Sequence, residues 1–486
     1  MRPLRLPDRV QLRACARAAR LAAWTGAAAL LLWGCADPAG IAPKAQALTA
    51  DRVGLAAFGG PSDPAIAADW WRGFGDPVLD ALVERSLSDN PNLKVVAARL
   101  ARAAAGVAGA QSTDGVHVDG AADVTRQRLS ANTYFPPPLG GSTVTMGNVQ
   151  IGASWEADVF GRNRSAIEAA VGMQRAAEAD LQAARTVLAS EVARSYVQLS
   201  RLFAQRDVAQ RALAQREEIL ALIRQRVQGG LDTNVELRQG EGALPDARLQ
   251  IEQIDEQIGQ ARRALAALGA QPPSALDGLV PGALHPLGLP PRVPADLLGR
   301  RADVAAARWR IEAATSDMAS ARAEFYPDVN LVAFVGLSSI GLDKLFSSGS
   351  REYGVGPAIR LPIFDNGYLR ARLGGKAADV DGAIASYNAA VVEAARQAAD
   401  QIGALQSIER QQLQQTSAQD RAEQAYALAT QRYRAGLGSY LTVLNVEAAL
   451  LSQRRLAADL RARLLDAQIA LARALGGGYA APATGA

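Results

Sequence analysis

Apolar and polar residues alternate regularly along several segments of this chain. Four segments alternate with the period of two that is typical of β-strands; Val149, Ile151 and Ala153, for example, are separated by polar or small residues. Their length of about ten residues suits a tilted strand that crosses a membrane. The alternative is a small soluble β-domain. The predicted strands are 116–125, 144–160, 328–338 and 352–364.

The phase of this alternation changes within the second of these segments. Val144 and Met146 lie on the opposite phase from Val149 and the apolar residues after it. One extra residue in a strand would produce such a shift. The sequence therefore predicts a β-bulge near Gly147 and Asn148.

Two much longer segments, 163–228 and 366–435, are rich in alanine with scattered Arg, Glu and Gln, and contain almost no proline. A helix rises ~1.5 Å per residue, so each would be roughly 100 Å long. A globular domain does not need helices of that length, and the pattern is typical of a coiled coil or a helical tube.

The chain also repeats itself at a long period. The segment 155–162 resembles 359–366, and 225–233 resembles 431–439. Each half reads as a helix, two strands, a long helix, a tight turn and a helix. We therefore predict two structural repeats, at 69–275 and 299–478, joined by a linker at 276–298 and followed by a tail at 479–486.

The turns after the two long helices carry matching capping residues. Gly230 can adopt the left-handed conformation that ends a helix, and Thr233 with Glu236 has the spacing of a capping box. Gly436 and Ser439 repeat the end and the start signal in the second half.

The N-terminus is basic and is followed by an apolar run that ends before Cys35. The run is too short for a membrane-spanning helix but suits a signal peptide. We predict a signal peptide at 1–34, a lipidated Cys35, and an extended tether at 35–68. With Cys15 in the signal, Cys35 has no disulfide partner, and acylation explains a lone exported thiol. A plain secretory signal with an incidental cysteine is the alternative.

Charge and chemistry exclude several classes of protein. The formal net charge of +4 comes from the six arginines within residues 1–34, so the remainder is nearly neutral and does not suit nucleic acid. His117 and His285 are the two histidines, and neither has a nearby nucleophile or ligand set. No phosphate-binding loop follows a strand. The sequence thus predicts no enzyme, no cofactor and no metal site.

Strand number constrains the oligomeric state. Four strands cannot close a barrel, and lipid does not tolerate an open sheet edge. Two chains would give eight strands, whose interior is filled by side chains. Three chains would give twelve, which leaves room for a pore. If the strands cross a membrane, a homotrimer follows.

Residues Leu32 to Cys35 resemble a bacterial lipoprotein cleavage box. Six further motifs lie at 71–79, 155–162, 289–304, 325–327, 361–365 and 474–479. Together these motifs resemble the TolC-like outer-membrane efflux proteins, in their lipoprotein branch called NodT-like or OprM-like. In the central motif Ala302 stands where the family usually has proline.

The resemblance implies a mainly α fold with a transmembrane β-barrel. A homotrimer would form a twelve-strand outer-membrane barrel, with four strands per chain, continued by a long periplasmic α-helical tunnel. The resemblance also implies a passive conduit for small molecules such as drugs, in an RND-type multidrug efflux system. Its partners would be a periplasmic adaptor (membrane fusion protein), an inner-membrane RND-type pump, and outer-membrane lipid through the barrel and the acylated, palmitate-bearing Cys35.

The same resemblance assigns residues at the helical turns. The periplasmic gate would comprise Tyr433, Leu441, Thr442 and Asn445, with Leu441 as an apolar constriction. Relatives have aspartates at the positions of Thr442 and Asn445, so closure here would depend more on Leu441 and on neutral hydrogen bonds. Ordinary helix-surface residues are the alternative. The adaptor-contact tips would be Gly229, Gly230, Leu231, Thr233, Gly436, Leu437, Gly438 and Ser439.

Two other functions remain open from the sequence. The same fold could be the exit duct of a protein-secretion system. A lipid-anchored periplasmic structural coiled-coil protein without a pore would also need long helices, but not four strands of membrane-spanning length.

Overall fold

The computed structural model describes residues 37–49, 66–132, 135–288, 300–365 and 367–479. The predicted signal peptide, Cys35 and most of the predicted tether lie outside this range. The chain divides into two compact units. One contains the four strands and the adjoining ends of helices α3, α4, α6 and α7; the other contains the remainder of these helices with α2, α5 and α8.

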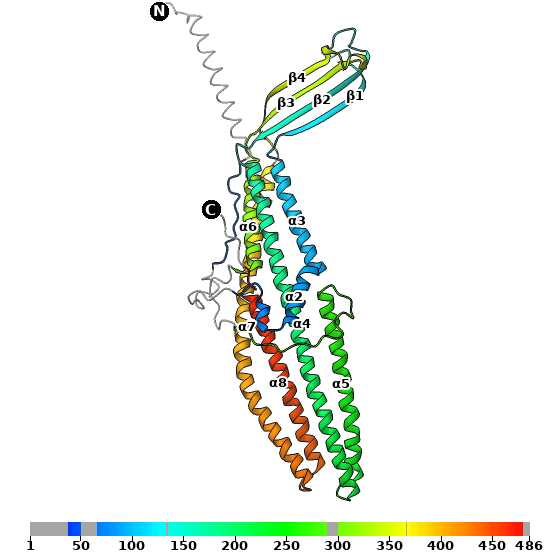
Figure 1. The fold of residues 1–486 in the computed structure, drawn as a ribbon. Helices are drawn as coiled ribbons and strands as arrows, with labels where there is room; N and C mark the ends of the chain where they lie inside the picture. The colour runs from blue at the N-terminus through cyan, green and yellow to red at the C-terminus, as the bar shows by residue number, and fades with distance from the viewer. Residues whose placement is uncertain (1–36, 50–65, 133–134, 289–299, 366, 480–486) are drawn as a thin grey trace, which may run out of the picture. The chain divides into compact units, whose positions relative to one another are not determined.

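The strands form one antiparallel sheet in the order β1-β2-β3-β4 (Figure 1). Their bounds are β1 His117–Arg128, β2 Thr143–Ala157, β3 Asp328–Ile340 and β4 Arg351–Arg360. Each strand therefore ends or begins within a few residues of its expected position. Strands β1 and β4 are the edges, and each pairs along only one side within the chain.

The two faces of this sheet differ sharply in polarity. Directly paired residues share a face, and one row across all four strands is Val118, Ala153, Ala333 and Val355. The next row on that face is Gly120, Ile151, Val335 and Tyr353. The large side chains of these rows, namely Val118, Val355, Ile151, Val335 and Tyr353, are all more than half exposed.

The opposite face carries mainly polar and small residues, with Val332 and Phe334 among its apolar exceptions. Its rows include His117 with Ser154, and Asp119 with Gly152, Phe334 and Gly354. A sheet with one exposed apolar face and one polar face is suited to lipid on one side and water on the other.

The bulge predicted near Gly147 and Asn148 is wrong. Pairing of β2 with both neighbours runs through these residues without an inserted residue. Side chains of the loop after β3 cover Gly147: a β-carbon there would lie 2.9 Å from Cδ2 of Leu342 and 3.2 Å from Cδ2 of Leu345. Because the pairing is regular, Val144 and Met146 lie on the opposite face from Val149, and the change of phase requires no slip in register.

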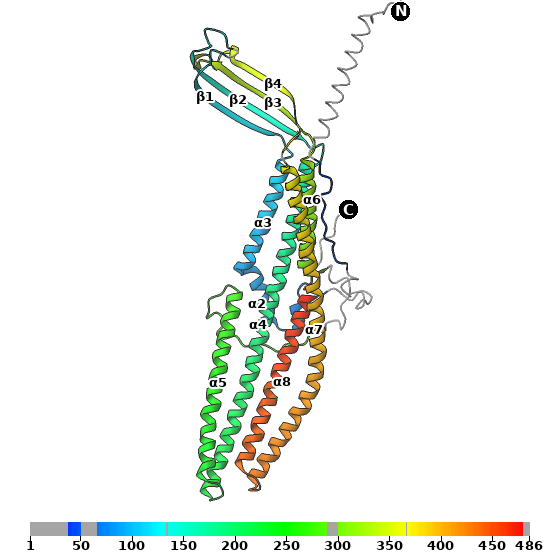
Figure 2. The ribbon, with the colours of Figure 1, turned by 180° about the vertical axis from the view of Figure 1, so that it is seen from behind.

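The long helices are α4 Arg162–Gln228 and α7 Tyr368–Arg434, each of 67 residues. Both confirm the predicted long helical segments. Each is followed, after a tight turn, by a helix of 35 residues: α5 Asn234–Leu268 and α8 Tyr440–Ala474. Figures 1 and 2 show α5 beside α4 and α8 beside α7.

The remaining helices are short. They are α2 Pro77–Asp89, α3 Pro91–Ser112 and α6 Ala302–Ala323, with 3-10 turns η3 Trp70–Phe74, η5 Leu342–Lys344 and η6 Ser348–Ser350. Helix α6 begins at Ala302 although the family-like motif has proline there, so a residue with high helix propensity suffices. In the part of the chain that the structure describes, no helix is long and apolar enough to span a bilayer.

The first family-like motif packs the helical unit. Trp70, Trp71 and Phe74 are buried together with Leu79 of α2. Asp76 caps α2, since its carboxylate accepts the Val78 amide at 3.0 Å.

The second oxygen of that carboxylate accepts hydrogen bonds from distant parts of the chain. Its donors are the Tyr196 hydroxyl of α4, at 2.5 Å, and the Gly282 amide of the linker, at 3.0 Å. One buried carboxylate therefore joins the start of α2, the middle of α4 and the linker.

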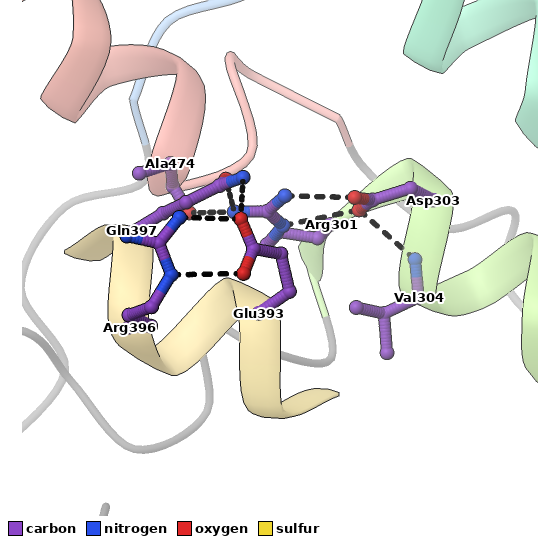
Figure 3. A network of polar contacts seen from close by, with 7 residues as sticks. All are labelled: Arg301, Asp303, Val304, Glu393, Arg396, Gln397 and Ala474. Carbon is purple, nitrogen blue, oxygen red and sulfur yellow. Dashed lines mark hydrogen bonds and ion pairs between the residues drawn. The ribbon is translucent and has the colours of Figure 1, made fainter. Parts of the chain in front are cut away.

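The end of the central family-like motif contains a buried guanidinium, that of Arg301 (Figure 3). Arg301, just before α6, makes two bonds to Asp303, at 3.0 and 2.7 Å. Its remaining nitrogen donates to the Gln397 amide oxygen of α7 and to the Ala474 carbonyl of α8, each at 3.1 Å. Because Arg presents five donors in a fixed fork, this one residue connects three helices.

We expect Asp76→Ala to lower the stability of the helical unit by roughly 2–4 kcal/mol, because it removes an N-cap and leaves the buried Tyr196 hydroxyl without its acceptor. Thermal unfolding of the detergent-solubilised protein, followed by helical circular dichroism, measures the change. Asp89→Ala, at the half-exposed end of the same helix, is the control. Equal melting temperatures for the two variants would contradict this account of Asp76.

Candidate functional site at the helical turns

The two turns that follow the long helices have the same backbone geometry. In the first, the Leu231 amide bonds to the Arg226 carbonyl at 2.8 Å, and Gly230 has a positive φ of 67°. In the second, the Leu437 amide bonds to the Arg432 carbonyl at 2.8 Å, and the φ of Gly436 is 77°. Both are the glycine-ended caps that the sequence predicts.

The helices that leave these turns are also capped as predicted. Thr233 and Glu236 form a complete capping box at the start of α5. The Ser439 hydroxyl accepts the Thr442 amide, at 3.4 Å, at the start of α8. The turns are therefore rigid, well-specified structures rather than loose loops.

A polar network ties the first turn to helix α7. The Tyr433 hydroxyl donates to the Asp232 carboxylate at 2.5 Å. Arg226 donates to the same carboxylate twice, at 2.9 and 3.2 Å, and to the Tyr433 carbonyl at 3.1 Å. The guanidinium carbon lies 4.8 Å from the centre of the Tyr433 ring, in cation–π contact. We call these three residues the tip network.

Charge and burial reinforce the tip network. Burial alone would raise the pKa of Asp232, but hydrogen bonds from Arg226 and Tyr433 outweigh it, so the pKa is lowered. Burial, and then the bond to Asp232, raise the pKa of Tyr433. At neutral pH the carboxylate is therefore ionised and the phenol remains a neutral donor, which are the states that these bonds require.

An apolar cluster lies beside the tip network. Tyr433 packs against Tyr440 of α8, with the ring centres 6.0 Å apart. The cluster brings together α4, α7 and α8; its buried members are Ile219, Ile223, Tyr433, Tyr440 and Val443.

The predicted gate residues fall into two separate groups. Tyr433 is fully buried in the cluster. Leu441 is 58% exposed, and Thr442 and Asn445 are also exposed. Leu441, Thr442 and Asn445 lie on the side of α8 opposite to the buried Val443, outside the cluster that contains Tyr433. Within a single chain, then, the structure does not bring the four together.

The predicted tip residues are largely at the surface. Leu231 and Leu437 occupy equivalent positions in the two turns and are 69% and 70% exposed. Of the remaining tip residues, Gly229, Gly230, Thr233, Gly436, Gly438 and Ser439 are exposed as well.

Sequence reasoning missed Arg226 and Asp232. The signal that could have found Asp232 is a difference between the repeats: Asp232 is acidic, whereas the equivalent residue of the second turn is Gly438. Arg226 likewise has an equivalent, Arg432, which lacks such a partner and donates to the Leu437 carbonyl instead. In the described residues no group of three or more His, Cys, Asp or Glu could hold a metal ion.

Comparison with known proteins decides the family. The profile of the outer membrane efflux protein family matches residues 82–270 and 293–477, one match in each half of the chain. The chain belongs to the outer membrane efflux protein family. Its members are channels, and the protein is therefore the outer-membrane channel component of an efflux system.

Individual relatives agree with this assignment. The chain is 35% identical to the fusaric acid resistance protein FusA of Burkholderia cepacia, over 73% of this chain and 68% of FusA. It is 32% identical to the putative multidrug resistance outer membrane protein MdtQ of Escherichia coli, over 84% of this chain and 88% of MdtQ.

A solved structure supports the fold. The outer membrane protein VceC of Vibrio cholerae is 34% identical, with a TM-score of 0.80, over 85% of this chain and all of VceC. VceC and the outer-membrane channel OprN, which is 29% identical with a TM-score of 0.78 over 90% of this chain and 97% of OprN, confirm the predicted fold class. That class is a homotrimer with a twelve-strand barrel and a helical tunnel.

Proposed function

We propose that this channel is a passive, lipid-anchored conduit that works with a periplasmic adaptor and an inner-membrane RND-type pump to export small molecules. The observation that best supports a conduit is the sheet with one apolar and one polar face. Its exposed apolar rows suit lipid, its polar rows suit a water-filled lumen, and its two unpaired edges fit the edges of neighbouring chains.

The lipid anchor is supported by the described residues just after Cys35. The Arg370 side chain, near the start of α7, donates to the carbonyls of Asp37 and Ala39. Further along, Asp381 of α7 accepts the amides of Lys44 and Ala45, both at 2.7 Å. Because α7 starts a few residues after β4 ends, residues 37–45 run beside the part of α7 that is nearest to the strands in the chain, which suits a lipid anchor attached just before them.

The turns are proposed as the contact with the adaptor. Leu231 and Leu437 are large apolar side chains that remain mostly exposed on rigid turns, and exposed apolar residues at such positions mark interaction surfaces. In a trimer the two turns of each chain would present six such tips.

We also propose that the turns close the tunnel at rest. The tip network fixes the first turn to α7. Leu441, Thr442 and Asn445 are exposed, and in a closed trimer they would face its axis. With no charge on these three side chains, closure depends on packing of Leu441 from three chains and on the tip network.

Leu441→Gly should raise single-channel conductance several-fold in a planar bilayer, because it removes the apolar constriction. Val235→Gly is the matched control, since Val235 is the equivalent exposed residue of the first repeat and belongs to α5 rather than α8. If Leu441→Gly conducts no better than the control variant, Leu441 is not the constriction.

Deletion of the gene should increase susceptibility to exported compounds, because a pump without an outer-membrane channel releases its cargo into the periplasm. Tolerance is measured across antibiotics, dyes, metals and aromatic acids, with fusaric acid included because of the similarity to FusA. Restoration by the wild-type gene is the control. Unchanged tolerance to every compound would contradict a role in small-molecule export.

A further inference from the structure

Three charged residues are buried in the part of the chain that the structure describes: Asp76, Arg301 and Glu447. Asp76 and Arg301 hold the ends of helices together, as described above. Glu447 differs, because it lies within α8, two turns of helix beyond the start at Tyr440.

Glu447 occupies a position where an apolar residue is expected. The buried residues Tyr440, Val443, Glu447 and Leu450 are spaced as the core positions of a coiled-coil heptad. A charged residue at such a position makes the coil less stable than an apolar one would, and its best-attested use is to fix the register of the helices.

The partner of Glu447 comes from the other helical pair. Arg216 of α4 donates to Glu447 at 2.9 Å, and the side chains are only 22% and 5% exposed. The same guanidinium donates to the Ala243 carbonyl of α5 at 3.1 Å. Arg216 therefore joins α8 to both α4 and α5.

Other ion pairs between α4 and α8 are weaker candidates for this role. Arg194 with Asp466 and Arg201 with Asp459 are roughly one-third to one-half exposed, so water and salt screen them. Only the Arg216–Glu447 pair, among the α4–α8 pairs of the described chain, is shielded by the apolar cluster that includes Tyr440 and Val443.

We propose that the Arg216–Glu447 pair is a second contact, besides the tip network, that keeps the channel closed by holding α8 in register against α4 and α5. We call this pair the second latch. A buried ion pair adds little net stability compared with an apolar pair, because removing two charges from water is costly. When α8 moves away, however, both charges regain hydration, so the contact can be broken at lower cost than an equal apolar surface. It therefore restrains α8 without preventing its release.

This inference rests on the proposed closure at the turns and extends it to a site above the tip network. The internal repeat provides a matched control. Glu241 of α5 is the equivalent of Glu447, 206 residues earlier, but it is 34% exposed and contacts Arg238 and Arg224.

The test is single-channel conductance of purified wild-type and variant channels in planar bilayers. Glu447→Gln should raise the open fraction roughly 10-fold, because it leaves Arg216 buried without its partner. Glu241→Gln should leave the open fraction unchanged. The exchange of both residues, Arg216→Glu with Glu447→Arg, should restore much of the closed behaviour, which a merely destabilising substitution would not do.

Tyr433→Phe separates failure of this inference from failure of the proposed gate. If Tyr433→Phe opens the channel and Glu447→Gln does not, the second latch is overturned while the gate stands. If neither opens it, both the latch and the proposed closure are overturned. Should Glu447→Gln yield no channels, Arg216→Gln breaks the same pair from the other side, and a conductance equal to wild type would overturn the latch.

Discussion

Closure of the backbone hydrogen bonds of a four-stranded sheet is the constraint on which the remainder of this protein depends. Strands β1 and β4 each have one unpaired edge, and an open edge is not stable in lipid. The exposed apolar face places the sheet in lipid, and the edges then require neighbouring chains. Oligomerisation is thus a consequence of the fold, and the pore is a consequence of oligomerisation.

The two repeats share the architecture of the helical part and differ in their special contacts. Both long helices have 67 residues, and both turns use the same cap. The tip network depends on Asp232, whose equivalent in the second turn is Gly438. Glu447 is buried against Arg216, whereas its equivalent Glu241 is 34% exposed. The parts that both repeats share form the helical tunnel. The contacts found in only one repeat are candidates for controlling its opening.

The local sequence pattern predicted the helices and strands but not the contacts between them. The long helices follow from alanine-rich segments with almost no proline, and the strands from alternation of apolar and polar residues. The bulge predicted at Gly147 was wrong because Val144 and Met146 lie on the opposite face of a regularly paired strand, so the change of phase needs no extra residue. The tip network was missed because it depends on which face of α4 meets α7. Glu447 stands at a core heptad position that spacing alone reveals, but its partner Arg216 lies 231 residues away.

The most direct test of this account is the number of chains in the purified, processed protein. Its mass in detergent, corrected for bound detergent, should be that of three chains, with the β-structure resisting heat as long as the complex is intact. A single chain that stays in solution without detergent would leave the apolar face of the sheet and both of its edges in water. That result would contradict the barrel, and with it the channel.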